Sequence, residues 1–190
     1  NLKEPVTEGT KKAARCFYAL EQNRADRKRY PAVNPIDSYS KYLEYPEFEE
    51  YIEKRINSEW IPKVNEMKTL LQRGKEIQEQ INILGDDGVP VDYHETFWKS
   101  EVIDFVILQQ DAFDKIDAVC PLDRQEYMLD LVMDICRHNY DFDNFVAVNE
   151  YFKRVINLCK QMNYSEFKSE QFNDYEHKLH ALLEEKQVAQ

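Results

Sequence analysis

The stretch FVILQQDAFDKIDAVCP, residues 105–121, decides how the rest of the chain is interpreted. It opens on apolar residues that close a helix predicted to begin near Asp92, and the polar run QQD at 109–111 then interrupts the apolar face. Pro121 lacks an amide hydrogen and restricts the backbone of Cys120, so the segment ends there. The pattern predicts a short piece between two long helices.

Phe113 stands in the middle of this piece, between Ala112 and Asp114. Ile116 and Val119 follow three and six residues later, so they can share the side of a short helical turn with Phe113. An aromatic residue in such a place is either a core residue or a surface offered to a flat ligand. Spacing alone favours the core, because a buried Phe is common.

Three amphipathic helices are predicted after Pro121, beginning at Asp123, at Phe145 and at about Ser165. Their inward positions are Tyr127, Met128, Leu131, Val132, Ile135 and Cys136, then Phe145, Val148, Phe152, Val155, Ile156, Cys159 and Met162, then Phe172, Tyr175, Leu179, Leu182 and Leu183. Spacings of three and four residues place each set on one face of its helix.

Helices are also predicted before the central stretch, over residues 47–57 and from Met67 to Leu84, with Pro62 kinking or restarting the chain between them. The sequence GDDG at 85–88 predicts a sharp turn. Asp92 is then expected to cap the next helix, with Glu95 as its capping-box partner.

The N-terminal part is predicted to be a loop over residues 1–9, a helix over 10–29 capped by Thr10, and an ordered loop over 29–42. Pro31 and Pro35 exclude regular helix from that loop, and Asp37 and Ser38 are candidate acceptors in its turns. No segment alternates with period two, so no strand is predicted. The predicted fold is all-α, a bundle of six to seven helices, with a connecting part at 1–45 and a helical domain at 46–190.

Composition excludes several classes of protein. A net charge of −11 argues against binding nucleic acid, and no apolar run approaches the roughly 20 residues of a membrane span. Four Cys without a CxxC pair are expected to be buried reduced thiols, which favours a cytosolic compartment. The four Gly, at positions 9, 74, 85 and 88, do not have the spacing of a phosphate-binding loop. A chain that begins at Asn1 without Met is expected to be an excised fragment.

Local chemistry offers little sign of a catalytic centre. His177 and His180 lie one helical turn apart near Asp174 and Glu184, but a further group of ligands is not evident, so a solvated face is favoured over a metal site. We therefore assign no catalytic residue and no metal ligand within the chain.

Three stretches, taken together and in order, carry a resemblance to a known family. They are EPVTEGT with CFYALEQNRADRKRYPAVNPIDSYSKY, then EIQEQINILGDD, and then FVILQQDAFDKIDAVCP. The set resembles the region after the nucleotide-binding core in the catalytic A subunit of archaeal and bacterial V-type (A-type) ATPases. The resemblance covers essentially the whole chain and implies its C-terminal helical domain.

The resemblance implies that Phe113 lines an adenine pocket, with Gln110 and Ala112 as its neighbours. It implies ATP or ADP with Mg in the intact subunit, whereas the fragment, without a P-loop, is expected to be inactive and to hold no nucleotide tightly. Relatives often have Phe where Leu2 stands, which puts a second aromatic contact in question.

The partners implied by the resemblance are a B subunit in an alternating hexameric ring and a central-stalk rotor subunit, which the turn between Gly85 and Asp92 would meet. That turn has Gly88 and Pro90 where the family has a more helical acidic stretch. The domain is expected to transmit torque for ion transport at the cytoplasmic face of the cell membrane, without inserting into it. The alternative is a free-standing acidic helical module that binds other proteins and no nucleotide.

Overall fold

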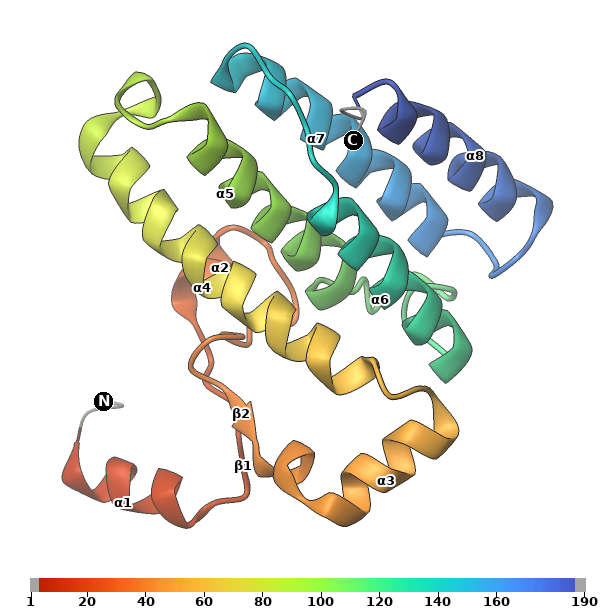
Figure 1. The fold of residues 1–190 in the computed structure, drawn as a ribbon. Coiled ribbons are helices and arrows are strands. Elements are labelled where there is room, and N and C mark those ends of the chain that lie inside the picture. The colour runs from red at the N-terminus through yellow and green to blue at the C-terminus, as the bar shows by residue number, and fades with distance from the viewer. Residues whose placement is uncertain (1–3, 187–190) are drawn as a thin grey trace. The chain divides into compact units, whose positions relative to one another are not determined.

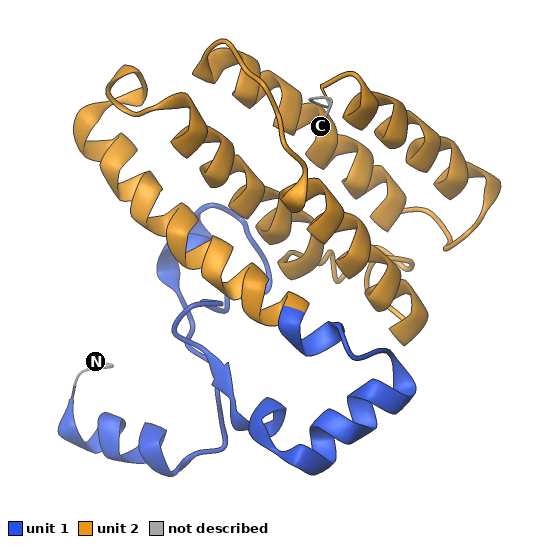
Figure 2. Cartoon of the chain, in the orientation of Figure 1, with its two compact units in different colours: residues 1–62 blue, residues 63–190 orange. Residues whose placement is uncertain are grey.

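The computed structural model describes residues 4–186 and confirms the mostly helical class. The chain divides into two compact units, residues 1–62 and 63–190 (Figure 2). Eight α-helices lie among the described residues, together with one two-stranded antiparallel sheet. The expectation that the chain has no strand is therefore wrong. The functional boundary between residues 45 and 46 stays a prediction.

The first unit begins with helix α1, Pro5–Ala13, where a loop was predicted. Pro5 suits the first turn of a helix, since its missing N–H would have no partner there. Thr10 lies inside α1 and donates its hydroxyl to Val6 O at 2.9 Å, so it is not the cap of a later helix.

The sheet explains why the predicted helix over 10–29 does not form. Strands β1, Cys16–Phe17, and β2, Tyr39–Ser40, pair in antiparallel register, and the rings of Phe17 and Tyr39 stack at 5.9 Å. This pairing leaves only a short helix, α2, Gln22–Asp26. Two paired residues are too few to show a period of two in the sequence.

The segment that follows is an ordered loop, as predicted, but its turn is organised by Asn34. This side chain is 5% exposed, and its Oδ1 accepts from the amides of Ile36 at 2.8 Å and Asp37 at 2.9 Å. Asp37 and Ser38 play other parts, because Asp37 accepts from Asn34 Nδ2 and Ser38 Oγ accepts from the Ala19 amide. The 3-10 helix Lys41–Glu44 and helix α3, Pro46–Arg55, follow the loop.

The second unit is a helical bundle (Figure 1). Its elements are α4, Trp60–Leu84, which begins just before the unit; the 3-10 turn Asp86–Gly88; α5, Val91–Ile103; the π-helix Asp104–Leu108; α6, Leu122–Arg137; α7, Phe145–Asn163; and α8, Glu170–Glu184. Helix α7 contacts both α5 and α8. The buried side chains of these helices, such as Val102, Val132, Phe152 and Leu179, form the core on the faces that periodicity predicts.

Several helix ends differ from the predictions. Pro90, not Asp92, is the N-cap residue of α5, and Glu95 instead pairs with Lys99 at 2.6 Å. Helix α8 starts later than predicted, since Ser169 Oγ accepts from the Phe172 amide and caps it there. The predicted turn at 85–88 does form.

The four Cys are free, but only Cys136 and Cys159 are fully buried, and burial raises the pKa of each of these two thiols to about 12. Cys16 and Cys120 are half-buried, contrary to the expectation for all four. None of the helices within residues 4–186 combines the length and the hydropathy that a membrane span requires.

Candidate functional site

The candidate site is the loop at residues 109–121, which follows a change of helix type. The π-helix Asp104–Leu108 continues α5, and it ends where the Gln109 amide donates to Asp104 O, five residues back, at 2.9 Å. Gln109 itself is extended. Single π-helical turns are frequent at functional sites, because they redirect the residues that follow.

Aspartate side chains hold the loop in shape from inside. Asp111 Oδ1 accepts from the Phe113 amide at 2.9 Å. Asp114 Oδ1 accepts from the amides of Ile116 at 2.9 Å and Asp117 at 2.8 Å. Such side-chain bonds to nearby amides replace the backbone bonds that a regular helix would supply.

Asp117 joins the two ends of this structure. Its Oδ2 accepts from the Asp111 amide at 2.5 Å, and its backbone carbonyl accepts from Gln110 Nε2 at 2.6 Å. Burial raises the pKa of the Asp117 carboxyl, and the nearby charges of Asp114 and Asp111 act in the same direction. The loop is thus closed by contacts between its start and its last turn.

Phe113 is 99% exposed, so the core alternative that spacing favoured is wrong. The reason is local, since Ile116 is half-buried while Phe113 and Val119 are exposed, so the three do not share one side of the turn. An exposed Phe on an ordered loop leaves its ring face open to a flat ligand. Ala112 and Gln110 are also exposed on the same loop, so the three predicted site residues lie together.

The base of the loop is fastened to the end of α7 by contacts that the sequence did not reveal. Asn163 Nδ2 donates to Val106 O of the π-helix at 2.9 Å. Arg124, 3% exposed on α6, donates from a terminal guanidinium nitrogen to Met162 O at 3.1 Å. A buried guanidinium beside a helix C-terminus is favoured by the partial negative charge there. An Arg on an otherwise amphipathic helix gives no sign of this in the sequence.

The loop is chemically better suited to a flat, uncharged ring than to an anion. An adenine ring is flat and uncharged, and stacking on an exposed aromatic ring is open to it. A triphosphate would meet the negative charge of a loop that holds three aspartates, Asp111, Asp114 and Asp117, and one lysine, Lys115. An exposed aromatic ring among carboxylates therefore suits contact with an uncharged ring rather than with phosphate.

The turn before α5 is anchored on its inner side and open on its outer side. His94 is 1% exposed, and its Nε2 lies 2.9 Å from Asp86 O; a carbonyl only accepts, so this nitrogen carries the hydrogen. Gly85 has φ of +79°, a conformation that favours glycine. Ile83 is 81% and Leu84 61% exposed beside the acidic residues of the turn. The anchoring by His94 was not predicted.

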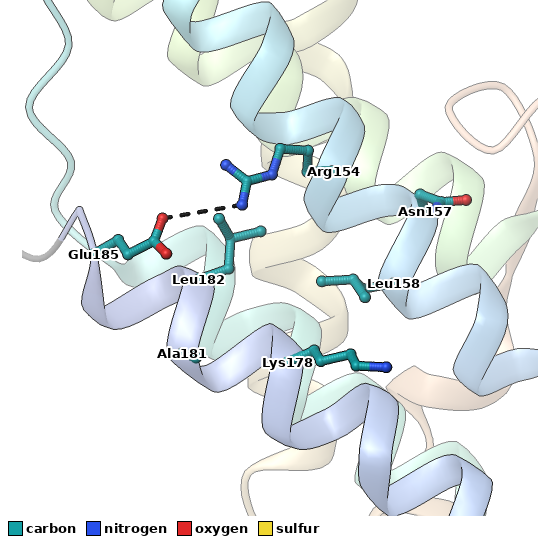
Figure 3. Close-up of a pocket in the computed structure, with 7 residues that line it drawn as sticks. All are labelled: Arg154, Asn157, Leu158, Lys178, Ala181, Leu182 and Glu185. Atoms are coloured by element: carbon teal, nitrogen blue, oxygen red, sulfur yellow. Dashed lines mark ion pairs between the residues drawn. The ribbon is translucent and has the colours of Figure 1, made fainter.

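A separate groove lies between α7 and α8 (Figure 3). It has a volume of about 380 Å³, with Leu158, Ala181 and Leu182 among its lining and Arg154 facing Glu185 at 4.0 Å. None of the predicted site residues lines it. In the part of the chain that the structure describes, no cluster of His, Cys, Asp or Glu could hold a metal ion, and His177 and His180 are exposed. Leu2 lies outside the described residues.

Comparison with known proteins identifies the family. Residues 49–141, which include the turn at 85–92 and the whole of the loop at 109–121, match the model of the C-terminal domain of V and A type ATP synthase. The chain is 33% identical to the V-type ATP synthase alpha chain of Borrelia duttonii, over 99% of this chain and 30% of that protein. It is 35% identical to the one of Chlamydia trachomatis serovar L2, over 99% of this chain and 31% of that protein.

A solved structure supports the fold alone. The ATP synthase subunit NeqB of Nanoarcheaum equitans superimposes with a TM-score of 0.54 at 13% identity, covering 73% of this chain and 32% of that one. The chain spans about 30% of the length of the curated relatives that it matches, in their C-terminal part. It therefore belongs to the V- and A-type ATP synthases and corresponds to the C-terminal domain of their alpha chain, the A subunit.

Proposed function

We propose that this chain, within an intact A subunit, places Phe113 against the adenine of ATP or ADP. Gln110 and Ala112 flank the base, and the domain carries torque between the nucleotide and a central rotor. The subunit would thereby couple ATP hydrolysis or synthesis to the transport of protons or sodium ions. The observation that carries the proposal is the 99% exposure of Phe113 on a loop whose shape is fixed by side-chain hydrogen bonds.

The energetics limit what this contact does. Stacking of a base on an aromatic side chain contributes about 1–3 kcal/mol, which corresponds to roughly 5- to 140-fold in affinity. That is too little to hold ATP without contacts to its phosphates. The groups that bind the phosphates and Mg, and the catalytic groups, are therefore expected in other parts of the subunit. The chain alone is expected to be inactive.

The exposed turn at residues 85–92 supports a contact with the rotor subunit. Ile83 and Leu84 are exposed beside Asp86 and Asp87, while His94 fixes the turn to the bundle. A rigid, exposed end of a long helix is suited to receive a push from a moving shaft. We further propose a B subunit as neighbour in an alternating hexameric ring, at the cytoplasmic face of the cell membrane.

The test uses the full-length subunit assembled with its partner subunits. Phe113→Ala is expected to raise KM for ATP about 5- to 140-fold, by the loss of stacking. Val146→Ala, which truncates a 49% exposed side chain on α7, is the control and is expected to leave KM unchanged. An unchanged KM in an assembled Phe113→Ala complex would contradict the adenine contact and favour the interaction-module alternative.

A further inference from the structure

We infer that Asp117 is a positioning residue that holds the 109–121 loop in the conformation in which Phe113 meets the base. The inference rests on the proposed function and adds to it a residue that the motif resemblance did not single out. Phe113 supplies the aromatic ring that meets the base, whereas Asp117 fixes the position of that ring.

The first step is the chain of hydrogen bonds from Asp117 to Phe113. Asp117 Oδ2 accepts from the Asp111 amide at 2.5 Å, and Asp111 Oδ1 accepts from the Phe113 amide at 2.9 Å. The peptide at Phe113 is therefore bound to a residue that Asp117 itself binds. Loss of the Asp117 carboxylate releases Asp111 first and the Phe113 backbone with it.

The second step is the closure that Asp117 makes at the level of the backbone. Gln110 Nε2 donates to Asp117 O at 2.6 Å, so Gln110 and Asp117 are joined by side chain and main chain around Phe113. Hydrogen bonds between residues that are six and seven positions apart in the sequence restrict the conformations of the segment between them. The predicted neighbour Gln110 thus serves the loop through this bond, whatever it contacts in a nucleotide.

The third step is direction. Asp117 lines a small cavity beneath the loop together with Asp111, Asn163 and Tyr164, while Phe113 is 99% exposed. The Asp117 side chain therefore faces the bundle, and the ring of Phe113 faces solvent. Asp117 acts on a base through Phe113, since Asp117 lines the cavity and Phe113 does not.

The charges around Asp117 are consistent with a structural carboxylate. Burial raises its pKa, the amide of Asp111 and the positive charge of Arg124 act against that rise, and Asp114 and Asp111 add to it. The same carboxylates contribute to the raised pKa of Tyr164, after burial. The side chain is thus partly desolvated and is retained by specific donors.

The test is a double-mutant cycle in the full-length subunit assembled with its partners, with ATPase activity as readout. Asp117→Ala is expected to raise KM for ATP about threefold to tenfold, with kcat within about twofold, because the net contribution of one hydrogen bond, the one to the Asp111 amide, is lost. Asp117→Asn keeps an oxygen that accepts from Asp111 and is expected to restore most of the affinity. Asp134→Ala, an exposed carboxylate on α6, is the matched control and should change neither constant.

The decisive comparison is with the Phe113→Ala background. If Asp117 acts through Phe113, adding Asp117→Ala to Phe113→Ala raises KM no further. A multiplicative effect of the two changes would overturn the inference, as would an unchanged KM in Asp117→Ala while Phe113→Ala raises it; the adenine contact would stand in both cases. An unchanged KM in Phe113→Ala would overturn both the adenine contact and the inference about Asp117. If Asp117→Ala does not assemble, Asp117→Ser, which also cannot reach the Asp111 amide, replaces it in the cycle.

Discussion

Gly74 has no side chain, and this allows helices α4 and α5 to approach each other closely. It is buried on α4, and a β-carbon there would lie 1.9 Å from Ser100 Oγ and 2.4 Å from Ser100 Cβ on α5. Gly74→Ala is therefore expected to destabilise the protein by about 1–3 kcal/mol and to lower its melting temperature in circular dichroism.

Two further variants make that expectation specific. Gly9→Ala on α1, where no atom lies within 4 Å of the added carbon, should have no such cost and should favour the helix. Combining Gly74→Ala with Ser100→Gly, which removes the clashing atoms, should recover part of the loss. Equal melting temperatures for Gly74→Ala and the wild-type protein would show that α4 and α5 do not meet at these residues.

Individual residues also show what could not be predicted from the sequence. Spacing favoured a buried Phe113, which its exposure contradicts. The motif resemblance implied that Phe113 lines an adenine pocket, and that role stays a prediction. Spacing failed because the loop is a series of irregular turns and no continuous helix, so Phe113, Ile116 and Val119 do not share one side. Arg124 and Asn163 were not predicted at all, since their partners are backbone carbonyls that no sequence pattern displays.

At the scale of elements, an ion pair between Glu66 of α4 and Arg137 of α6 gives a pH dependence. Arg137 Nε and a terminal nitrogen donate to the two Glu66 oxygens at 3.1 and 2.6 Å. The hydrogen bond from Arg137 holds the pKa of Glu66 below its usual 4.5. A carboxyl with a lowered folded pKa adds stability above its unfolded pKa, and that stability is lost as pH falls through the folded pKa.

Glu66→Gln is accordingly expected to lower the free energy of unfolding by about 0.2–1 kcal/mol at pH 7, because both partners are well exposed. The difference from wild type should shrink as pH falls below 4.5 and through the lowered folded pKa of Glu66, because the carboxyl then becomes protonated in the folded state as well. Urea unfolding across this pH range measures it, with the exposed Glu79→Gln on the same helix as control. A difference that stays constant down to pH 3 would contradict a charge-dependent contact.

Elements also differ in how well they could be predicted. The apolar faces of α6 and α7 were predicted residue by residue, because each packs one continuous face into the core. The predicted helix over residues 10–29 failed because the backbone there pairs with residues 39–40, which lie far along the chain. Local periodicity carries no information about such a partner.

For the whole molecule, burial predicts unequal stability along the chain. Helix α7 has eight buried residues, whereas α1 has none among its nine. Amide hydrogen exchange on residues 1–190 is expected to be slowest in α7 and close to unprotected in α1, since opening α1 exposes no core. Mass spectrometry of peptic peptides measures both regions in one sample. Protection of α1 equal to that of α7 would contradict this order.

The π-helix Asp104–Leu108 has a consequence for changes in chain length. Each residue of an α-helix advances the chain by about 100° around the axis. Deleting one residue from 104–108 would let the segment close as ordinary α-helix and keep its hydrogen bonds, yet it would swing residue 113 about a quarter of a turn around α5. Among homologues, insertions and deletions here are therefore expected to be rarer than substitutions, since a deletion costs little in folding but turns the aromatic ring away from the position in which we propose that it meets the base.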